Sequence, residues 1–151
     1  TLQKELELLN NYLIIMNIRY NNKITFRQQI PPHLLDTEIP RFILQPLVEN
    51  SIQYSYAGSS TNAIITLIAS CSKETLTLLL SDNGRGMTKQ AINEYNDIFI
   101  RNRPSSGVGM VNVIRRIRLE YGDAYGIRLQ PNTPCGLNVI LERPLTFTEN
   151  K

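Results

Sequence analysis

Three short motifs in this sequence carry residue types that could together hold a metal ion and a phosphorylated ligand. The first, residues 44–51 (LQPLVENS), sets Asn50 at the edge of a helical apolar pattern. An amide oxygen is a neutral, hard ligand for Mg²⁺, so Asn50 would suit a metal–phosphate site. Glu49 lies about 100° around the helix from Asn50 and points to a different side. Alone, the motif is a weak signal, because an exposed Asn and Glu on a helix are usually solvated.

The second motif, residues 82–87 (DNGRGM), directly follows a β-rich run. A carboxylate at the end of a strand, here that of Asp82, can accept a hydrogen bond from an exocyclic amine. Gly84 and Gly86 would let the backbone pass close to a flat ring. The alternative is a hairpin turn, for which Asn-Gly is a common signal. An EF-hand calcium loop is excluded, because its later acidic residues are missing.

The third motif, residues 107–112 (GVGMVN), lies where a loop meets a predicted helix. Free N–H groups and the positive end of the helix dipole favour an anion there, and Gly107 and Gly109 leave room for a phosphate. A dinucleotide-binding fold would need a third glycine where Asn112 stands, and a strand directly before the loop. The sequence has neither, and it contains no P-loop motif.

Helices and strands along the chain must position these motifs. Apolar residues at alternating spacings of four and three predict a long amphipathic helix from Leu2 to Ile18. It packs either on the core of its own domain or against another helix, as a dimer seam or an interdomain stalk. A strand is expected at 24–28, a helix at about 40–56 kinked by Pro46, a hairpin at 63–69 and 75–80, and a short helix from Thr88 to about Tyr95. A mobile loop at 96–107, a helix from Val108 to the C-cap Gly122, and strands at about 126–130 and 137–143 complete the order. This order predicts an α+β fold, a two-layer sandwich of helices on a mixed β-sheet.

Composition favours one folded domain and disfavours several function classes. The chain has 151 residues, of which 42% are hydrophobic and 19% charged, and its net charge is only +3. Its arginine cluster at 115–118 is interpreted as a solvated helix face, so we expect no nucleic acid partner. Two distant cysteines without metal-ligand spacing favour a reducing cytosolic setting. No apolar run approaches the roughly 18 residues of a membrane span, and because the chain begins at Thr1 we expect a piece of a longer protein.

In this order, the three motifs resemble the N, G1 and G2 boxes of the Bergerat ATP-binding fold. That fold is shared by DNA gyrase, the ninety-kilodalton heat-shock chaperone, sensor histidine kinases and MutL. Residues 39–50 (IPRFILQPLVEN) and 107–113 (GVGMVNV), followed by Tyr121 and Gly122, resemble membrane-bound sensor histidine kinases of the LytS and YesM type. The resemblance covers essentially the whole chain.

The resemblance implies an ATP-binding catalytic domain that transfers the γ-phosphoryl group of Mg·ATP to a histidine outside this chain. Asn50 would bind Mg²⁺, Asp82 would accept from the adenine amino group, and Glu49 is the candidate catalytic residue. Residues 88–106 would form a lid, and Gly136 would lead the strand under the adenine. The residues implied to contact the nucleotide are Asn50, Gln53, Tyr54, Asp82, Gly84, Gly86, Met87, Gly107, Val108, Gly109 and Met110.

The same resemblance implies a domain organisation and partners. Residues 1–22 would be the end of the dimerisation and phosphotransfer helix, and residues 23–151 the catalytic domain. The implied partners are the phosphoacceptor histidine domain of the same parent protein and a response regulator. The parent would be a homodimer at the cytoplasmic face of the cell membrane, attached through a part that this chain lacks. The sole histidine, His33, follows two prolines and is interpreted as a surface residue.

Departures from the family pattern leave two alternatives open. Pro46 occupies a position that is often Asn in other histidine kinases and Glu in gyrase-like ATPases, and Gln53 replaces a common Lys. A neutral imidazole needs no general base to attack phosphorus, whereas a water-activating ATPase would want a carboxylate that Pro46 cannot provide. The alternatives are an ATP-hydrolysing conformational ATPase of the same superfamily, using Glu49, and a degenerate module that only binds nucleotide or dimerises.

Overall fold

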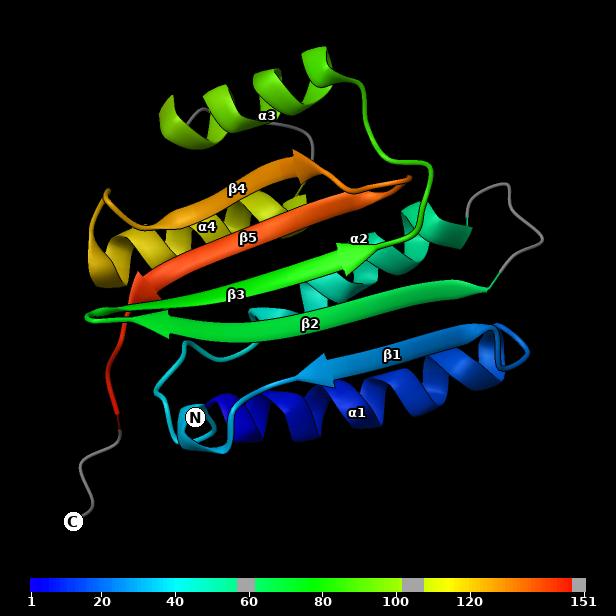
Figure 1. Ribbon diagram of the computed structural model, residues 1–151, viewed down its shortest axis with the longest axis horizontal. Coiled ribbons are helices and arrows are strands. Elements are labelled where there is room, and N and C mark those ends of the chain that lie inside the picture. The colour runs from blue at the N-terminus through cyan, green and yellow to red at the C-terminus, as the bar shows by residue number, and fades with distance from the viewer. Residues whose placement is uncertain (57–61, 102–107, 148–151) are drawn as a thin grey trace.

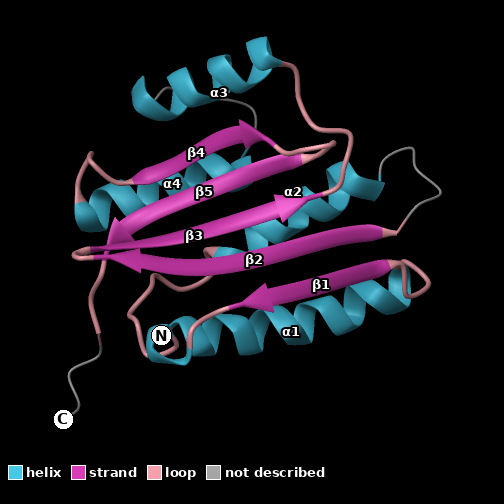
Figure 2. Cartoon of the chain, viewed as in Figure 1, coloured by secondary structure: helices cyan, strands magenta, loops and turns pink. Residues whose placement is uncertain are grey.

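A five-stranded mixed β-sheet forms one layer of the molecule, and helices α1, α2 and α4 lie together behind it (Figures 1 and 2). The computed structural model describes residues 1–56, 62–101 and 108–147. Its strands are β1 (Ile24–Gln29), β2 (Ala63–Ser72), β3 (Thr75–Asp82), β4 (Gly126–Pro131) and β5 (Leu137–Pro144). They are ordered β1-β2-β3-β5-β4; β1 runs parallel to β2, and the other neighbours are antiparallel. The predicted α+β sandwich is confirmed.

Alternating burial along the strands creates the core between the two layers. Successive side chains of a strand point to opposite faces, and every second residue is buried along β3, β5 and β2 as far as Ala69. The helices present their apolar stripes to the same space. The principal buried side chains are Ile65, Leu67, Leu78, Leu80, Val139 and Leu141 from the sheet, and Leu47, Ile52, Val113 and Ile117 from the helices. This packing fixes α2 and α4 relative to the ends of β3 and β5.

Helix α1 (Leu2–Arg19) packs on the core of the same chain. Its predicted stripe of Leu2, Leu6, Leu9 and Leu13 is buried within the main hydrophobic cluster. Of the two interpretations of this stripe, packing on its own domain's core is therefore the one that the structure supports. A second apolar side of the helix stays exposed and consists of Leu8, Ile14, Ile15 and Ile18. The division between residues 1–22 and 23–151 stays a prediction.

Helix α2 (Leu44–Tyr56) begins four residues later than expected, because its start is held by α1. The buried Glu5 carboxylate accepts hydrogen bonds from the backbone N–H groups of Phe42 at 2.7 Å and Ile43 at 3.2 Å. These groups would otherwise have no partner within the helix. The φ of Phe42 is +58°, which is incompatible with a helix through this position. Pro46 consequently lies in the first turn, where its missing N–H removes no helical bond.

Helix α3 (Lys89–Arg101) is longer than the sequence suggested. Its predicted cap is confirmed, since Thr88 Oγ1 accepts from the Ala91 N–H at 3.2 Å. The predicted end near Tyr95 and the loop over 96–101 are wrong. The reason is tertiary: Asn96 donates to the Leu129 carbonyl at 3.0 Å and accepts from its N–H at 2.8 Å, which satisfies the open edge of β4. The rest of the predicted loop, residues 102–107, lies outside the described residues.

Helix α4 (Val108–Tyr121) runs from the third motif to the predicted C-cap. Gly122, with a φ of +91°, follows its last residue and donates to the Arg118 carbonyl at 2.8 Å. Residues 108–112 of the third motif thus form the start of α4, which lies beside α2. None of the helices in the described part of the chain is long and apolar enough to cross a membrane.

Candidate functional site

The Asp82 carboxylate, at the end of β3, is the centre of the site. It is 4% exposed, and its Oδ1 accepts from the backbone N–H groups of Gly84 at 2.9 Å and Leu137 at 3.1 Å. The Ser51 side chain of α2 donates to the same carboxylate. A carboxylate offers about four acceptor positions, so these three donors leave capacity for a further one. β3, β5 and α2 therefore converge on one buried acceptor.

Burial shapes the electrostatics of this carboxylate. Removal from water raises the pKa of Asp82 above its ordinary value, because the charged form loses hydration. The hydrogen bonds from Gly84, Leu137 and Ser51 act in the opposite direction and only partly offset burial. A hydrogen-bond donor on a ligand would stabilise the charged form further.

Three glycines form a cradle beside Asp82. Gly136 has a φ of +102°, and a β-carbon there would lie 1.9 Å from the Asp82 carbonyl oxygen. Gly86 has a φ of +67°, and its β-carbon would lie 2.8 Å from the Gly136 carbonyl oxygen. At Gly84 a β-carbon would be 3.0 Å from Asp82 Oδ1. The protein's own atoms fill the positions of these β-carbons, so only glycine allows the backbone segments to approach so closely around Asp82.

The first and third motifs of the predicted site meet where α2 passes the start of α4. A β-carbon on Gly109 would lie 3.7 Å from Asn50 Nδ2 and 3.8 Å from Pro46 Cβ. A cavity of about 220 Å³ opens at this junction, lined by Phe42, Pro46, Gly109, Asn112, Val113 and Arg116. The first N–H groups of a helix favour anions, and the Asn50 amide lies beside them. Since Ser51 follows Asn50 on α2, one helix connects the carboxylate end of the site to the anion end.

The other predicted site residues have varied positions. Gln53 is exposed on α2, whereas Met87 and Met110 are half-buried against the core. The side chains of Tyr54 and Val108 and all of Gly107 lie outside what the structure describes.

Glu49 is oriented away from this group. It is exposed and accepts from Gln45 Nε2 at 2.9 Å. Burial, followed by the charge of Glu49, raises the pKa of Tyr12 on α1 to about 12. Glu49 therefore faces α1, while Asn50 faces α4. The catalytic role of Glu49 stays a prediction.

Two residues that contact Asp82 were not singled out from the sequence. Ser51 lies three residues after Val48 and four after Leu47, which places it on the buried face of α2. A hydroxyl on a buried helix face requires a partner, and this was the signal available in the sequence. Asn132 donates to the Asp82 carbonyl at 2.8 Å from the loop between β4 and β5. Only the tertiary structure brings that loop to β3.

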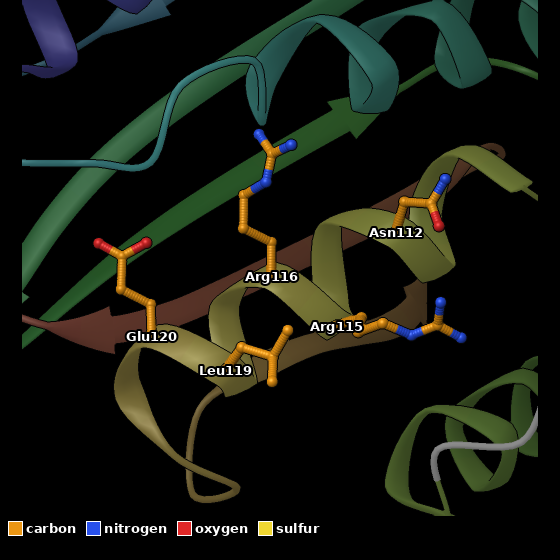
Figure 3. Close-up of a pocket in the computed structure, with 5 residues that line it drawn as sticks. All are labelled: Asn112, Arg115, Arg116, Leu119 and Glu120. Atoms are coloured by element: carbon orange, nitrogen blue, oxygen red, sulfur yellow. The ribbon is translucent and has the colours of Figure 1, made fainter.

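The arginine-rich outer face of α4 does not form a convergent site. Figure 3 shows Arg115 and Arg116 pointing in different directions, beside Leu119 and Glu120. These residues line a shallow hollow of about 490 Å³. Arg116 donates to the Arg41 carbonyl, which ties α4 to the segment before α2. This fits the interpretation as a solvated face. In the described part of the chain, no three His, Cys, Asp or Glu side chains are grouped to hold a metal, so a metal there would depend on Asn50 and on ligand oxygens.

Comparisons with known proteins agree with this geometry. A family model described as "Histidine kinase-, DNA gyrase B-, and HSP90-like ATPase" matches residues 36–146. Sensor histidine kinase YesM of Bacillus subtilis is 27% identical over 95% of the chain, and sensor protein LytS of Oceanobacillus iheyensis is 32% identical over 89%. The chain spans only 24% and 23% of the lengths of these relatives. The solved catalytic domain of histidine kinase ThkA has a TM-score of 0.67 at 19% identity and 95% coverage of both chains, which shows the shared fold.

Proposed function

Because the chain belongs to the histidine kinase-, DNA gyrase B- and HSP90-like ATPase family, we propose that it is the ATP-binding catalytic domain of a sensor histidine kinase. Its activity would be transfer of the ATP γ-phosphoryl group to a histidine outside residues 1–151. The main supporting observation is the buried Asp82 carboxylate, which has spare acceptor capacity and is linked through α2 to the contact between Asn50 and Gly109.

The residues present suit an adenine nucleotide and its metal. The glycine cradle at 84, 86 and 136 would admit the flat base, and Asp82 would accept from its amino group. Met87 and Met110 would supply apolar contacts, with Gln53 and Tyr54 nearby on α2. The start of α4, including Gly107, Val108 and Gly109, would hold the phosphates. Asn50 would hold Mg²⁺, which when bound supplies charge neutralisation and orientation of the transferred group.

The chemistry of the described residues favours a histidine acceptor over water. A neutral imidazole carries its own lone pair, so the domain needs to position phosphate and not to remove a proton. Pro46 has no group that could activate water, and Glu49 faces α1. These features weigh against the hydrolytic alternative.

His33 is a poor acceptor within this chain. Its Nε2 atom lies 3.9 Å from Cys71 Sγ, near the far end of β2. Asp82 pairs with Ile65 at the other end of that strand. At a rise of about 3.3 Å per residue, six residues separate the two places by roughly 20 Å. The proposed acceptor therefore belongs to a separate part of the parent protein.

The whole-protein context follows the resemblance. Residues 1–22 would end the dimerisation and phosphotransfer helix, and residues 23–151 would be the catalytic domain. The parent protein would act as a homodimer at the cytoplasmic face of the cell membrane and pass its phosphoryl group to a response regulator.

The isolated chain should bind Mg·ATP without phosphorylating itself, because the nucleotide motifs are present and a suitable acceptor is not. Calorimetry should detect binding, and γ-labelled ATP should leave no covalent label on the protein. Replacing Asn50 by Ala should weaken Mg·ATP binding about tenfold but leave binding in EDTA unchanged. Asn10→Ala, at an exposed position on α1 away from the proposed site, is the control.

Three outcomes would contradict this proposal. Label recovered on His33 would show that the chain carries its own acceptor. Steady ATP turnover that is lost in Glu49→Gln would favour the conformational ATPase. No heat with either Mg·ATP or Mg·ADP would favour a degenerate module that only dimerises.

Lowering the pH should weaken ADP binding but increase the contribution of Asp82 to the stability of the free protein. The folded-state pKa of Asp82 is raised, so in the window between its unfolded and folded values the folded state binds more protons. The contribution of Asp82 to stability is therefore present at low pH and is lost as pH rises through the folded pKa. ADP affinity should rise over the same window, because the ionised carboxylate is the better acceptor. Urea unfolding and ADP titrations between about pH 4 and about pH 7 should show these opposite trends. Asp82→Asn should abolish both, and parallel trends in the wild type would contradict the assignment.

A further inference from the structure

Ser55, in the last turn of α2, carries a buried hydroxyl for which the described part of the chain provides no hydrogen-bond partner. The residue is 6% exposed, and among the described residues its Oγ has no hydrogen-bond partner. In a helix, a serine hydroxyl commonly donates a hydrogen bond to the backbone carbonyl oxygen four residues earlier, but the Ser55 hydroxyl does not. Buried hydroxyls are nearly always paired, so one without a partner in the described part of the chain is a candidate for contact with a ligand.

The position of this hydroxyl connects it to the nucleotide site. Ser55 Oγ and Asp82 Oδ1 each lie 3.0 Å from the point that a β-carbon on Gly84 would occupy. Ser55 Cα also lies 3.0 Å from that point, so α2 approaches Gly84 closely and the protein leaves no room there for a side chain. Because both oxygens lie 3.0 Å from one point, they are no more than about 6 Å apart, on the two sides of Gly84.

The chemistry of adenine supplies the missing partner. Its 6-amino group is the donor that Asp82 would accept, and the ring nitrogens N1 and N7 beside that group are acceptors. A serine hydroxyl can donate to such a nitrogen. Ser51, the other hydroxyl of α2 near this place, already donates to Asp82.

Resting on the function proposed above, we propose that Ser55 is a further adenine-reading residue. Its hydroxyl donates to the ring nitrogen beside the amino group that Asp82 accepts, directly or through one shared water. Base recognition in this chain then comes from α2 as well as from the end of β3.

Thr37 provides a matched control for this hydroxyl. It is 0% exposed, and its Oγ1 likewise has no partner within the described part of the chain. It pairs with Phe147 beyond the end of β5, whereas Asp82 contacts Leu137 at the beginning of that strand. The two orphaned hydroxyls thus lie at opposite ends of the sheet.

The test compares the wild type with Ser55→Ala and Thr37→Val, measuring urea midpoints of the free proteins and ADP affinities by calorimetry. Both variants remove an unpaired buried hydroxyl, so both should keep or raise the urea midpoint. Only Ser55→Ala should weaken ADP binding, by about fivefold. A purely structural role for Ser55 would lower the midpoint and leave ADP affinity unchanged, and that result would overturn the inference.

Deaza analogues identify the ring atom. One analogue, either 1-deaza-ADP or 7-deaza-ADP, lacks the nitrogen that Ser55 contacts. The wild type and Ser55→Ala should bind that analogue with equal affinity. If the loss persists unchanged with both analogues, the hydroxyl does not read the ring and the inference fails. If the wild type binds no ADP, the proposed nucleotide function fails. If the wild type binds ADP but with the same affinity as Ser55→Ala, only the inference about Ser55 fails.

Discussion

Replacing Asp82 by Asn is expected to lower the affinity for Mg·ADP by about a hundredfold. The substitution keeps the shape of the side chain but exchanges an acceptor oxygen for an NH₂ group. That group would face the adenine amino group donor to donor, and the charge-assisted hydrogen bond would be lost. Because groups from β3, β5 and α2 all hold this side chain, the amide of the Asp82→Asn variant should occupy the same position as the carboxylate.

The measurement is calorimetry with Mg·ADP, together with circular dichroism to confirm that the variant is folded. Asp123→Asn removes an exposed carboxylate in the loop after α4 and serves as the charge-matched control. It should bind ADP like the wild type. A folded Asp82→Asn protein with wild-type affinity would exclude Asp82 as the base-reading group.

Replacing Gly136 by Ala is expected to destabilise the fold by about 3 kcal/mol. The added β-carbon would lie 1.9 Å from the Asp82 carbonyl oxygen, which is backbone and cannot rotate away. The φ of +102° adds strain for any residue with a β-carbon. Relief would require β3 and β5 to separate at Asp82, so ADP binding should be lost together with stability.

Gly122→Ala separates these two causes. Gly122 has a similar φ of +91°, but a β-carbon there would have nothing within 4 Å. It should therefore cost only the backbone strain, about 1 kcal/mol. Urea unfolding of both variants, with unchanged m-values, measures the difference. Equal destabilisation by the two substitutions would show that the contact at Asp82 is not the reason for glycine at position 136.

Most elements could be predicted because their patterns are local. The alternation along β2, β3 and β5 and the stripe of α4 follow directly from residue spacing. The errors occurred where a distant residue determines the boundary. Glu5 on α1 sets the start of α2, and Leu129 on β4 binds Asn96 just past the predicted end of α3. Neither partner lies near the affected boundary in sequence.

The candidate site divides in the same way. By itself, the sequence determined the order of elements, the fold class, the family resemblance and the three motifs with Asn50, Asp82 and the glycines, because each rests on residues a few positions apart. Only the tertiary structure decided that Ser51 and Leu137 donate to Asp82, that Glu49 faces α1, and that the Ser55 hydroxyl beside Gly84 has no partner among the described residues. The reason is physical: whether a buried polar group has a partner depends on which other strand or helix packs against it, and residue spacing carries no record of that packing.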